Sequence, residues 1–220
     1  MRVSREQAAE NREKILSVAA RLFREKGFDG IGIGDLMKSV GLTHGGFYGH
    51  FSSKEDLIAQ ACDRAVDELL ARNHKRCKEE VADQALKDQD LKNQDLNNPD
   101  SNKKIPGEAL EESGNYYQRF VANYLSCEHR DNPGAGCLTA ALGAEVARQS
   151  PLVKRAFTQG ANRLLNAVIK MLPAQKSEAE KREQALFTLA TLVGAQVIAR
   201  ALDDPELSQE VLDVVRKKLH

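Results

Sequence analysis

The amino-acid sequence predicts an all-α protein, with a small helical unit at the N-terminus and a larger helical bundle after it. Three observations lead to this fold class. Apolar residues recur at helical spacing through most of the 220 residues. Glycine and proline stand where those segments should end or begin. Almost no stretch alternates between apolar and polar residues as a strand does, so we expect about nine helices.

The N-terminal unit is expected to contain three helices. The first runs from about Glu6 to Lys26, and Gly27 is suited to end it. Its apolar stripe consists of Ile15, Leu16, Ala19, Leu22 and Phe23. A short second helix is expected near 33–40, before Gly41. A third should begin at Thr43, a favourable N-cap residue.

A fourth helix should begin after two consecutive serines and end in the mid-seventies. Ser52 and Glu55 have the spacing of a capping box, which Ser53 and Asp56 match less well. Residues 86–106 are polar, acidic and poor in apolar side chains. We therefore expect a flexible acidic insertion there; a functional acidic arm is the alternative.

Helical periodicity resumes at Tyr116 and breaks at 131–136, where proline and glycine exclude a regular helix. Four further helices are expected, at 137–149, 151–171, 178–202 and 205–219. Pro151 and Pro205 suit the first turns of two of them.

The charge balance limits how the chain could meet nucleic acid. Its 32 basic and 32 acidic residues give a formal net charge of zero, which argues against a protein that coats a polyanion. The charges are unevenly spread: residues 78–113 hold five basic and ten acidic side chains, and residues 1–60 hold nine and eight. A local contact with DNA therefore stays open.

The sequence also predicts a cytoplasmic protein that does not contact a membrane. The longest near-apolar run, 189–199, is too short to span a bilayer, and the N-terminus has no apolar signal region. The four cysteines form no CxxC pair and are expected to be free thiols.

Residues 31–51 have the pattern of a helix-turn-helix, in which the second helix enters the DNA major groove. Seven residues are candidate DNA contacts: Thr43, His44, Gly45, Gly46, Tyr48, His50 and Lys54. We expect the first two to meet base edges, the glycines to allow close backbone approach, and the last three to hold phosphates. Phe47 and Phe51 lie four residues apart and should be core.

Blander interpretations exist for some of these side chains. His44 and His50 could be packing or surface histidines, and Tyr48 could be only a surface aromatic. Arg2 and Arg5 could form a basic arm in the minor groove or a frayed terminus.

The spacing of these residues resembles the DNA-binding signature of the TetR (tetracycline-repressor-like) regulators. The similar positions are Phe23, Gly27, Phe28, Ile33, Asp35, Leu36, Val40, Gly41, Leu42, Thr43, Gly45, Phe47, Tyr48, His50, Phe51, Lys54 and Leu57. The resemblance covers residues 15–57. It implies a homodimeric repressor of nine or so helices that leaves a near-palindromic operator when a small molecule binds the larger domain. It also implies a DNA-binding domain at 1–52 and a ligand-binding and dimerisation domain at 53–220.

The chain departs from the family pattern at several points. The usual serine or threonine that opens the second helix is replaced by Ile31 and Gly32, with Gly34 following. Each glycine costs a helix interior about 1 kcal/mol relative to alanine. Met37 stands where the family usually has a small residue, and the segment 86–106 looks like an insertion.

The larger domain offers candidate ligand-binding residues: Tyr116, Tyr117, Phe120, Tyr124 and Cys137. The aromatic stripe could equally be core, since helical spacing fits both. Cys137 opens a predicted helix, where a thiolate is favoured, so a redox or electrophile sensor and a buried inert thiol are both open. The spacing of Cys127, His129 and Cys137 is not a standard zinc pattern, and we expect no metal and no cofactor.

The last two helices are expected to form a homodimer contact. One stripe consists of Phe187, Ala190, Thr191, Gly194, Ile198 and Ala201, and the other of Leu207, Val211, Val214, Val215 and Leu219. The alternative is packing within one chain. The family pattern, a contact built from two helices of each subunit, favours the interface.

These observations predict a DNA-binding transcriptional regulator, a ligand-released homodimeric repressor and not an enzyme. The alternatives are a ligand-responsive activator or a thiol sensor acting through Cys137. More distant rivals are a helical enzyme, for which no local catalytic motif is visible, and a protein-interaction module.

Overall fold

The computed structural model describes residues 4–95 and 108–219. Every regular element within these residues is a helix, which confirms the all-α prediction. Residues 96–107 and Arg2, where the sequence predicts part of the insertion and part of the basic arm, lie outside the described residues.

The N-terminal unit begins with α1 (Arg5–Lys26) and α2 (Ile33–Ser39), close to the expected bounds. Ser4 caps α1, because its side chain accepts a hydrogen bond from the Gln7 backbone N–H at 3.1 Å. Gly27 ends α1 with a φ of 79°, a left-handed conformation that other residues adopt at a cost.

The third element of this unit is a 3-10 helix, η1 (His44–Gly49), and not the α-helix that the sequence predicts. Three of its six residues are glycine, and the Thr43 side chain makes no capping hydrogen bond. Because glycine disfavours an α-helix and 3-10 turns are tolerated in short pieces, this segment closes into the tighter form.

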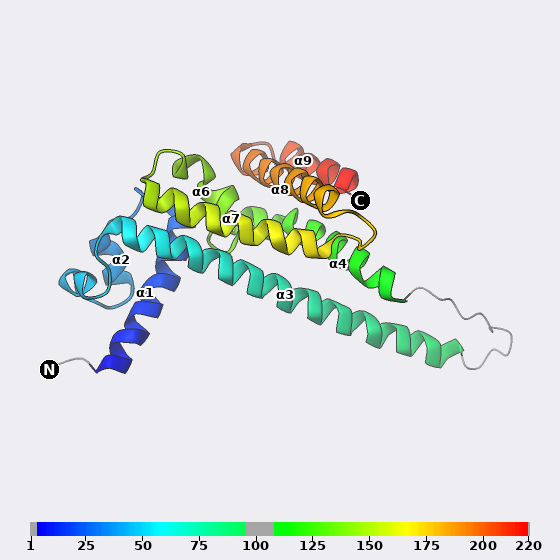
Figure 1. Ribbon diagram of the computed structural model, residues 1–220, viewed down its shortest axis with the longest axis horizontal. Coiled ribbons are helices and arrows are strands. Elements are labelled where there is room, and N and C mark those ends of the chain that lie inside the picture. The colour runs from blue at the N-terminus through cyan, green and yellow to red at the C-terminus, as the bar shows by residue number, and fades with distance from the viewer. Residues whose placement is uncertain (1–3, 96–107, 220) are drawn as a thin grey trace.

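The long helix α3 (Lys54–Asp95) corrects two predictions. It does not end in the mid-seventies, and the part of the predicted insertion from 86 to 95 is helical. Residues 78–95 contain no glycine or proline and are rich in Glu, Lys, Ala, Gln and Leu. Such residues extend a helix that its packed first half has already nucleated. In Figure 1, α3 continues past the end of the bundle.

The remaining helices are α4 (Glu108–Tyr124), α5 (Cys127–Asp131), η2 (Pro133–Ala135), α6 (Leu138–Val146), α7 (Pro151–Met171), α8 (Glu178–Ala201) and α9 (Pro205–Leu219). The bounds of α7 and α9 are those expected. The sequence missed α5 and η2, which are too short for periodicity to reveal.

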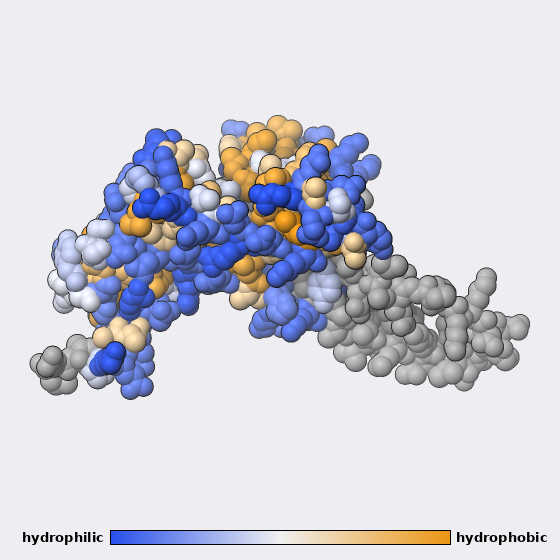
Figure 2. All heavy atoms as spheres, viewed as in Figure 1, coloured by the Kyte–Doolittle hydropathy of each residue, from blue (hydrophilic) through white to orange (hydrophobic). Residues whose placement is uncertain are grey.

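The helices pack into a bundle around one continuous core. α7 lies along α3, α3 packs on α1, and α8 pairs with α9 (Figure 1). Apolar side chains remain on the surface over α8 and α9 (Figure 2). The N-terminal unit (residues 4–52, here the reading unit) and the candidate dimer helices α8 and α9 therefore lie on different parts of the molecule.

By length and composition alone, α8 is the one described helix that could cross a membrane, although its longest near-apolar run, 189–199, is too short to do so. Two polar side chains of α8 are fully buried against α4. The Thr188 hydroxyl lies 2.9 Å from that of Tyr117, and the Gln196 amide donates to the Tyr124 carbonyl at 2.5 Å. These contacts are those of a bundle helix packed on its neighbours.

Candidate nucleic-acid interface

The reading unit is held together by an aromatic core. Phe47 and Phe51 are buried, and their rings stack with centroids 5.5 Å apart, which confirms the expected core role of both. Phe23 and Phe28 meet edge to face at 5.6 Å. This packing anchors η1 and turns its remaining side chains outward.

The predicted DNA contacts lie along η1 and the start of α3. Thr43, His44 and Tyr48 are exposed, and the Tyr48 side chain is 61% exposed although it is a large aromatic. His50 and Lys54 are half-buried. The His44 and Tyr48 rings lie edge to face with centroids 6.0 Å apart. The structure therefore presents hydrogen-bonding side chains from one short element.

The glycines of η1 are not required by packing within the chain. A Cβ atom at Gly45 or Gly49 would meet nothing within 4 Å, and one at Gly46 would touch the Thr43 hydroxyl at an ordinary 3.6 Å. No positive φ demands glycine at these positions. Bare backbone here is therefore free for close approach by another molecule.

The turn into α3 is fixed by Asp56. Its backbone N–H donates to the Ser53 hydroxyl at 3.0 Å, and its carboxylate accepts from the Ser52 backbone N–H at 2.9 Å. The capping pair is thus Ser53 and Asp56, so the prediction of Ser52 with Glu55 is wrong; α3 begins one residue later than that pairing assumed. The Ser52 hydrogen bond lowers the pKa of Asp56 below its ordinary value.

Two basic residues that the sequence analysis missed support the unit. The Arg12 guanidinium lies 5.2 Å above the Phe51 ring and bonds to the Gln60 side chain. Lys14 donates to the Val40 carbonyl at 2.9 Å and so ties α1 to the turn before η1. Met37, at the position where the family has a small residue, is fully buried.

Phe28 and Arg24 join the reading unit to the bundle. The Phe28 backbone N–H donates to the Glu145 carboxylate of α6 at 2.8 Å. Arg24, whose side chain is 1% exposed, donates to the Gly136 carbonyl and to Glu68, each at 3.2 Å. The sequence could have indicated that Arg24 is buried, because it follows the buried Leu16 and Ala20 at four-residue spacing on the same face of α1.

The predicted ligand residues lie mostly in the core. Tyr117, Phe120, Tyr124 and Cys137 are buried, and Tyr116 is half-buried. Tyr124 lines a cleft of about 490 Å³ beside α3, and the other four are not among the residues that line it. An aromatic pocket therefore stays a prediction, and the cleft is lined mainly by polar side chains.

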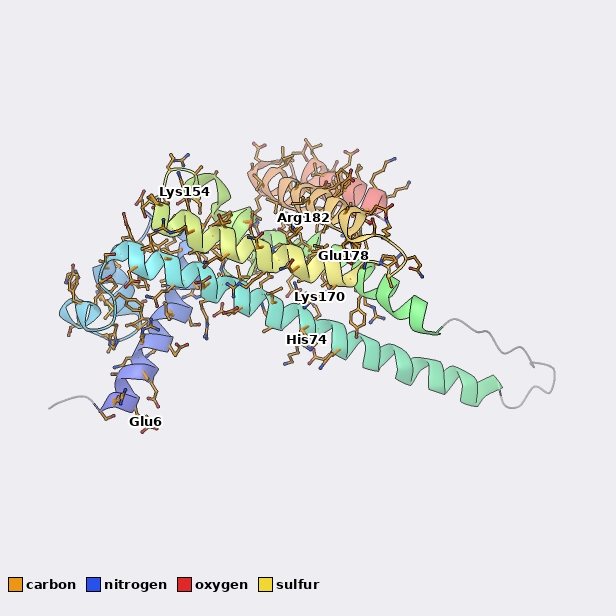
Figure 3. The ribbon with its side chains drawn as sticks, viewed as in Figure 1. Glu6, His74, Lys154, Lys170, Glu178 and Arg182 are labelled. Carbon is orange, nitrogen blue, oxygen red and sulfur yellow. The ribbon has the colours of Figure 1, made fainter. Side chains whose placement is uncertain are left out.

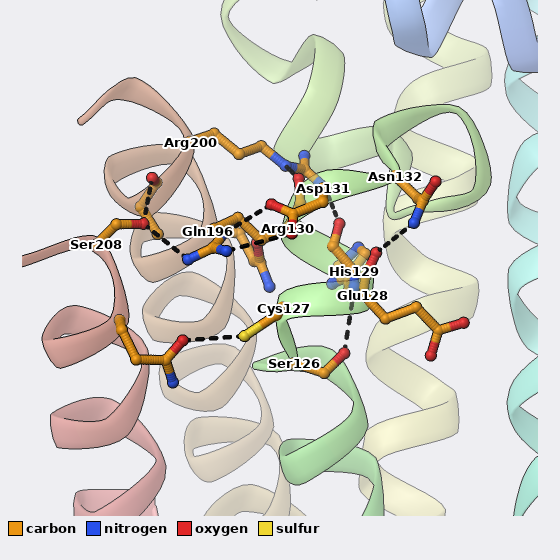
Figure 4. Close-up of polar contacts among 12 residues, drawn as sticks. Ser126, Cys127, Glu128, His129, Arg130, Asp131, Asn132, Gln196, Arg200 and Ser208 are labelled. Atoms are coloured by element: carbon orange, nitrogen blue, oxygen red, sulfur yellow. Dashed lines mark hydrogen bonds and ion pairs between the residues drawn. The ribbon is translucent and has the colours of Figure 1, made fainter. Parts of the chain in front are cut away.

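His129 organises the segment after α4 (Figure 4). Its Nδ1 lies 2.6 Å from the Tyr124 carbonyl, and its Nε2 accepts from the Cys137 backbone N–H at 2.9 Å. Because an acceptor nitrogen carries no proton, Nδ1 holds the hydrogen of a neutral imidazole. Burial lowers the pKa of His129 to about 4. No cluster of three or more metal-ligating side chains is found in the described part of the chain.

The predicted dimer stripes are exposed only in part in a single chain, because Val211, Val215 and Leu219 of the second stripe are half-buried and pack against the core. The large apolar side chains at the surface of α8 and α9 are Leu186, Phe187, Val197, Ile198, Leu207 and Val214. Phe187 is 64% and Ile198 51% exposed. An added Cβ at Gly194 would meet nothing within 4 Å. This face is therefore available for another surface.

Comparison with known proteins identifies the reading unit. A sequence profile described as "Bacterial regulatory proteins, tetR family" matches residues 15–61. The HTH-type transcriptional regulator AcrR of Shigella flexneri is 39% identical over 59 residues, which make up 27% of this chain and 27% of AcrR. The match to that relative is thus confined to about a quarter of its length.

Other similarities extend over the bundle. The HTH-type transcriptional repressor NemR of Escherichia coli strain K12 is 26% identical over 202 residues, covering 87% of this chain and 84% of NemR. The crystal structure of E. coli NemR in its reduced form aligns with a TM-score of 0.62 at 23% identity, covering 96% of this chain and 95% of that one. These relatives are transcriptional regulators, which confirms the prediction that the chain is not an enzyme. The chain belongs to the TetR family of bacterial regulatory proteins.

Proposed function

We propose that this regulator is a homodimeric repressor that leaves a near-palindromic operator when a small molecule binds its larger domain. The observation that carries the DNA-binding face is η1, which exposes Thr43, His44 and Tyr48 around glycines that nothing inside the chain requires. In this proposal residues 1–52 read DNA, and residues 53–220 bind the ligand and the second subunit. Soluble members of the family are in general cytoplasmic, and we propose the same location here.

Each η1 would occupy one major groove, and a twofold axis would set the two reading units one helical turn apart or a multiple of it. The junction contacts of Arg24 and Glu145 would carry movement of the bundle to α1. A ligand that binds more tightly to a dimer with a different distance between its reading units would then lower operator affinity. The size of the effect is set by the ligand's preference for that dimer state.

Substitutions in the reading unit should separate phosphate contacts from base contacts. Tyr48→Phe and Lys54→Ala are expected to weaken binding to every duplex, by about fivefold each, since each removes one phosphate contact. Lys54→Ala should also reduce the salt slope by about one. His44→Ala should change the preferred sequence. Gel shifts at several salt concentrations, with operators selected from random duplexes, measure all three.

The matched control is Lys170→Ala, an exposed lysine of α7 (labelled in Figure 3) whose loss should leave affinity and salt slope unchanged. If His44→Ala changes neither affinity nor sequence preference, the assignment of His44 to base reading fails. Tight binding that is insensitive to salt would contradict the phosphate roles.

The dimer contact is proposed for the exposed members of the α8 and α9 stripes, which include Phe187, Ile198 and Val214. Burying Phe187 and Ile198 against a second copy would remove large apolar surfaces from water, at about 25 cal/mol for each Å². Phe187→Glu combined with Ile198→Glu should therefore yield monomers at micromolar concentration by light scattering. The control variant Leu152→Glu changes an exposed apolar residue of α7, outside the proposed contact, and should stay dimeric. A wild-type monomer would contradict the interface.

A second candidate function is a thiol sensor at Cys137. The Cys137 thiol stands at the N-cap of α6, and helix N-termini are among the places where reactive cysteines occur. The related NemR structure is described as a reduced form, which motivates the proposal for this chain. Because Cys137 is 1% exposed, reaction would require local opening of the segment around it.

Alkylation mapping tests this candidate. Iodoacetamide should form a thioether at Cys137 with release of iodide, and operator affinity should fall as the modified fraction rises. Cys137→Ser should bind DNA normally and lose this response, and Cys127→Ser, which removes an exposed thiol, should retain it. Identical release in wild type and Cys137→Ser would remove the sensor from consideration.

A further inference from the structure

The cleft of about 490 Å³ lies between the middle of α3 and the segment from the end of α4 to η2. Its volume is in the range of sites for small organic ligands. Six residues of α3 line it: Leu69, Arg72, Asn73, Lys75, Arg76 and Glu79. Among the described residues that line it, Tyr124 is the only Phe, Tyr or Trp. The walls therefore suit a polar ligand better than an apolar one.

The cations of the cleft are not balanced by its carboxylates. Arg76 pairs with Glu128 at 2.6 Å, and Lys75 lies 3.7 Å from Glu79. Arg72 instead donates to the backbone carbonyl of Ala135, and no carboxylate lies within ion-pair distance of it in the described part of the chain. The lining thus carries one positive charge more than it neutralises.

The wall opposite α3 is backed by a further cation (Figure 4). Arg200 of α8 donates to the His129 carbonyl at 2.6 Å and to the Arg130 carbonyl at 3.0 Å, and its Nη1 is buried without a hydrogen-bond partner. His129 itself lines the cleft as a neutral ring. Burial lowers the pKa of His129, and the positive charges of Arg200 and Arg72 act in the same direction, so both cations influence this wall.

We propose that this cleft binds a small organic anion, a hydroxylated carboxylate or phosphate ester, and that this anion is the effector of the regulator. Arg72 and Lys75 would meet the charge, and the side-chain amides of Asn73 and Asn132 would hydrogen-bond the hydroxyl groups. The effector role rests on the proposed function, whereas the anion site stands on the geometry of the cleft.

The effect of anion binding at Arg72 would be transmitted to the reading unit through η2. Arg72 holds the Ala135 carbonyl, and η2 packs against α1, where a Cβ at Gly134 would collide with the Glu25 side chain. The carbonyl of the next residue, Gly136, accepts a hydrogen bond from Arg24 of α1 at 3.2 Å. An anion that draws Arg72 away from Ala135 therefore loosens the support of α1.

Matched probes test the site. Glucose 6-phosphate and gluconate carry the two anionic groups, and glucose is the neutral control, each titrated by calorimetry at constant ionic strength. We expect saturable binding of at least one anion and none of glucose. Arg72→Gln should weaken that binding by about tenfold and Lys75→Gln by less, since each removes a charge-assisted contact. Lys154→Gln, at an exposed lysine of α7 labelled in Figure 3, should change nothing.

Circular dichroism first establishes that each variant is folded. If Arg72→Gln does not fold, Lys75→Gln still tests the site. Equal binding of glucose and the anions, no saturable binding of either anion, or unchanged affinity in both cleft variants overturns the anion site. Operator binding without any probe reports on the proposed function separately. Anion binding that leaves operator affinity unchanged overturns the effector role alone.

Discussion

Replacing Glu68 with alanine is expected to lower the free energy of unfolding by about 3 kcal/mol, because it strips a buried cation of its carboxylate. The Arg24 side chain is 1% exposed, and its Nη2 lies 3.2 Å from Glu68, whose side chain is 25% exposed. Burial lowers the pKa of Arg24, and Glu68 opposes that effect. Urea denaturation at neutral pH, with the slope checked for two-state behaviour, measures the loss.

Glu13→Ala is the matched control. Glu13 pairs with Arg64 at 2.9 Å, but both side chains are more than a third exposed, so its loss should cost under about 1 kcal/mol. Combining Arg24→Leu with Glu68→Ala removes both charges and should recover part of the loss. A Glu68→Ala variant as stable as Glu13→Ala would show that the pair contributes little.

The same variants bear on regulation. Arg24 belongs to α1, and it binds the Gly136 carbonyl of the bundle at 3.2 Å. If this contact holds the reading unit in its DNA-binding position, Glu68→Ala should reduce operator affinity even where the protein stays folded, whereas Glu13→Ala should not.

Lowering the pH from 8 to 5 is expected to reduce stability by about 2 kcal/mol through His129 alone. Burial lowers its folded-state pKa to about 4, against an ordinary value of 6.5. In this interval the unfolded chain binds the proton and the folded chain does not. The contribution is therefore complete above about pH 6.5 and is lost as the pH falls toward 4.

The hydrogen bond at Nε2 favours the neutral ring in addition to burial. A protonated ring could no longer accept from the Cys137 backbone N–H, which lies 2.9 Å away. The free energy of unfolding, measured by denaturation at several pH values in this range, should depend much less on pH in His129→Gln than in the wild type. His74→Gln, at an exposed histidine of α3, should keep the wild-type pH dependence. An unchanged pH profile in His129→Gln would assign the acid sensitivity to other groups.

Much of the fold could be predicted from local signals. Gly27 marks the end of α1, and Pro151 and Pro205 mark the starts of α7 and α9. The prediction failed where local signals were ambiguous: the glycines of η1 select a 3-10 helix, and the polar segment to Asp95 continues α3. Apolar periodicity predicts only the part of a helix that is buried, so it cannot locate a helix end that lies away from the core.

The sequence by itself determined the helical class, the family and the surface of η1, because these depend on spacings within a few turns of chain. The tertiary structure decided how the parts are joined. Arg24 meets Gly136, 112 residues away, and Arg72 meets Ala135, 63 residues away. The spacing of Arg24 indicates burial, but the partners in such contacts leave no local pattern, since they belong to whichever distant segment covers the charged group. The cleft and the junction between the reading unit and the bundle are therefore products of packing alone.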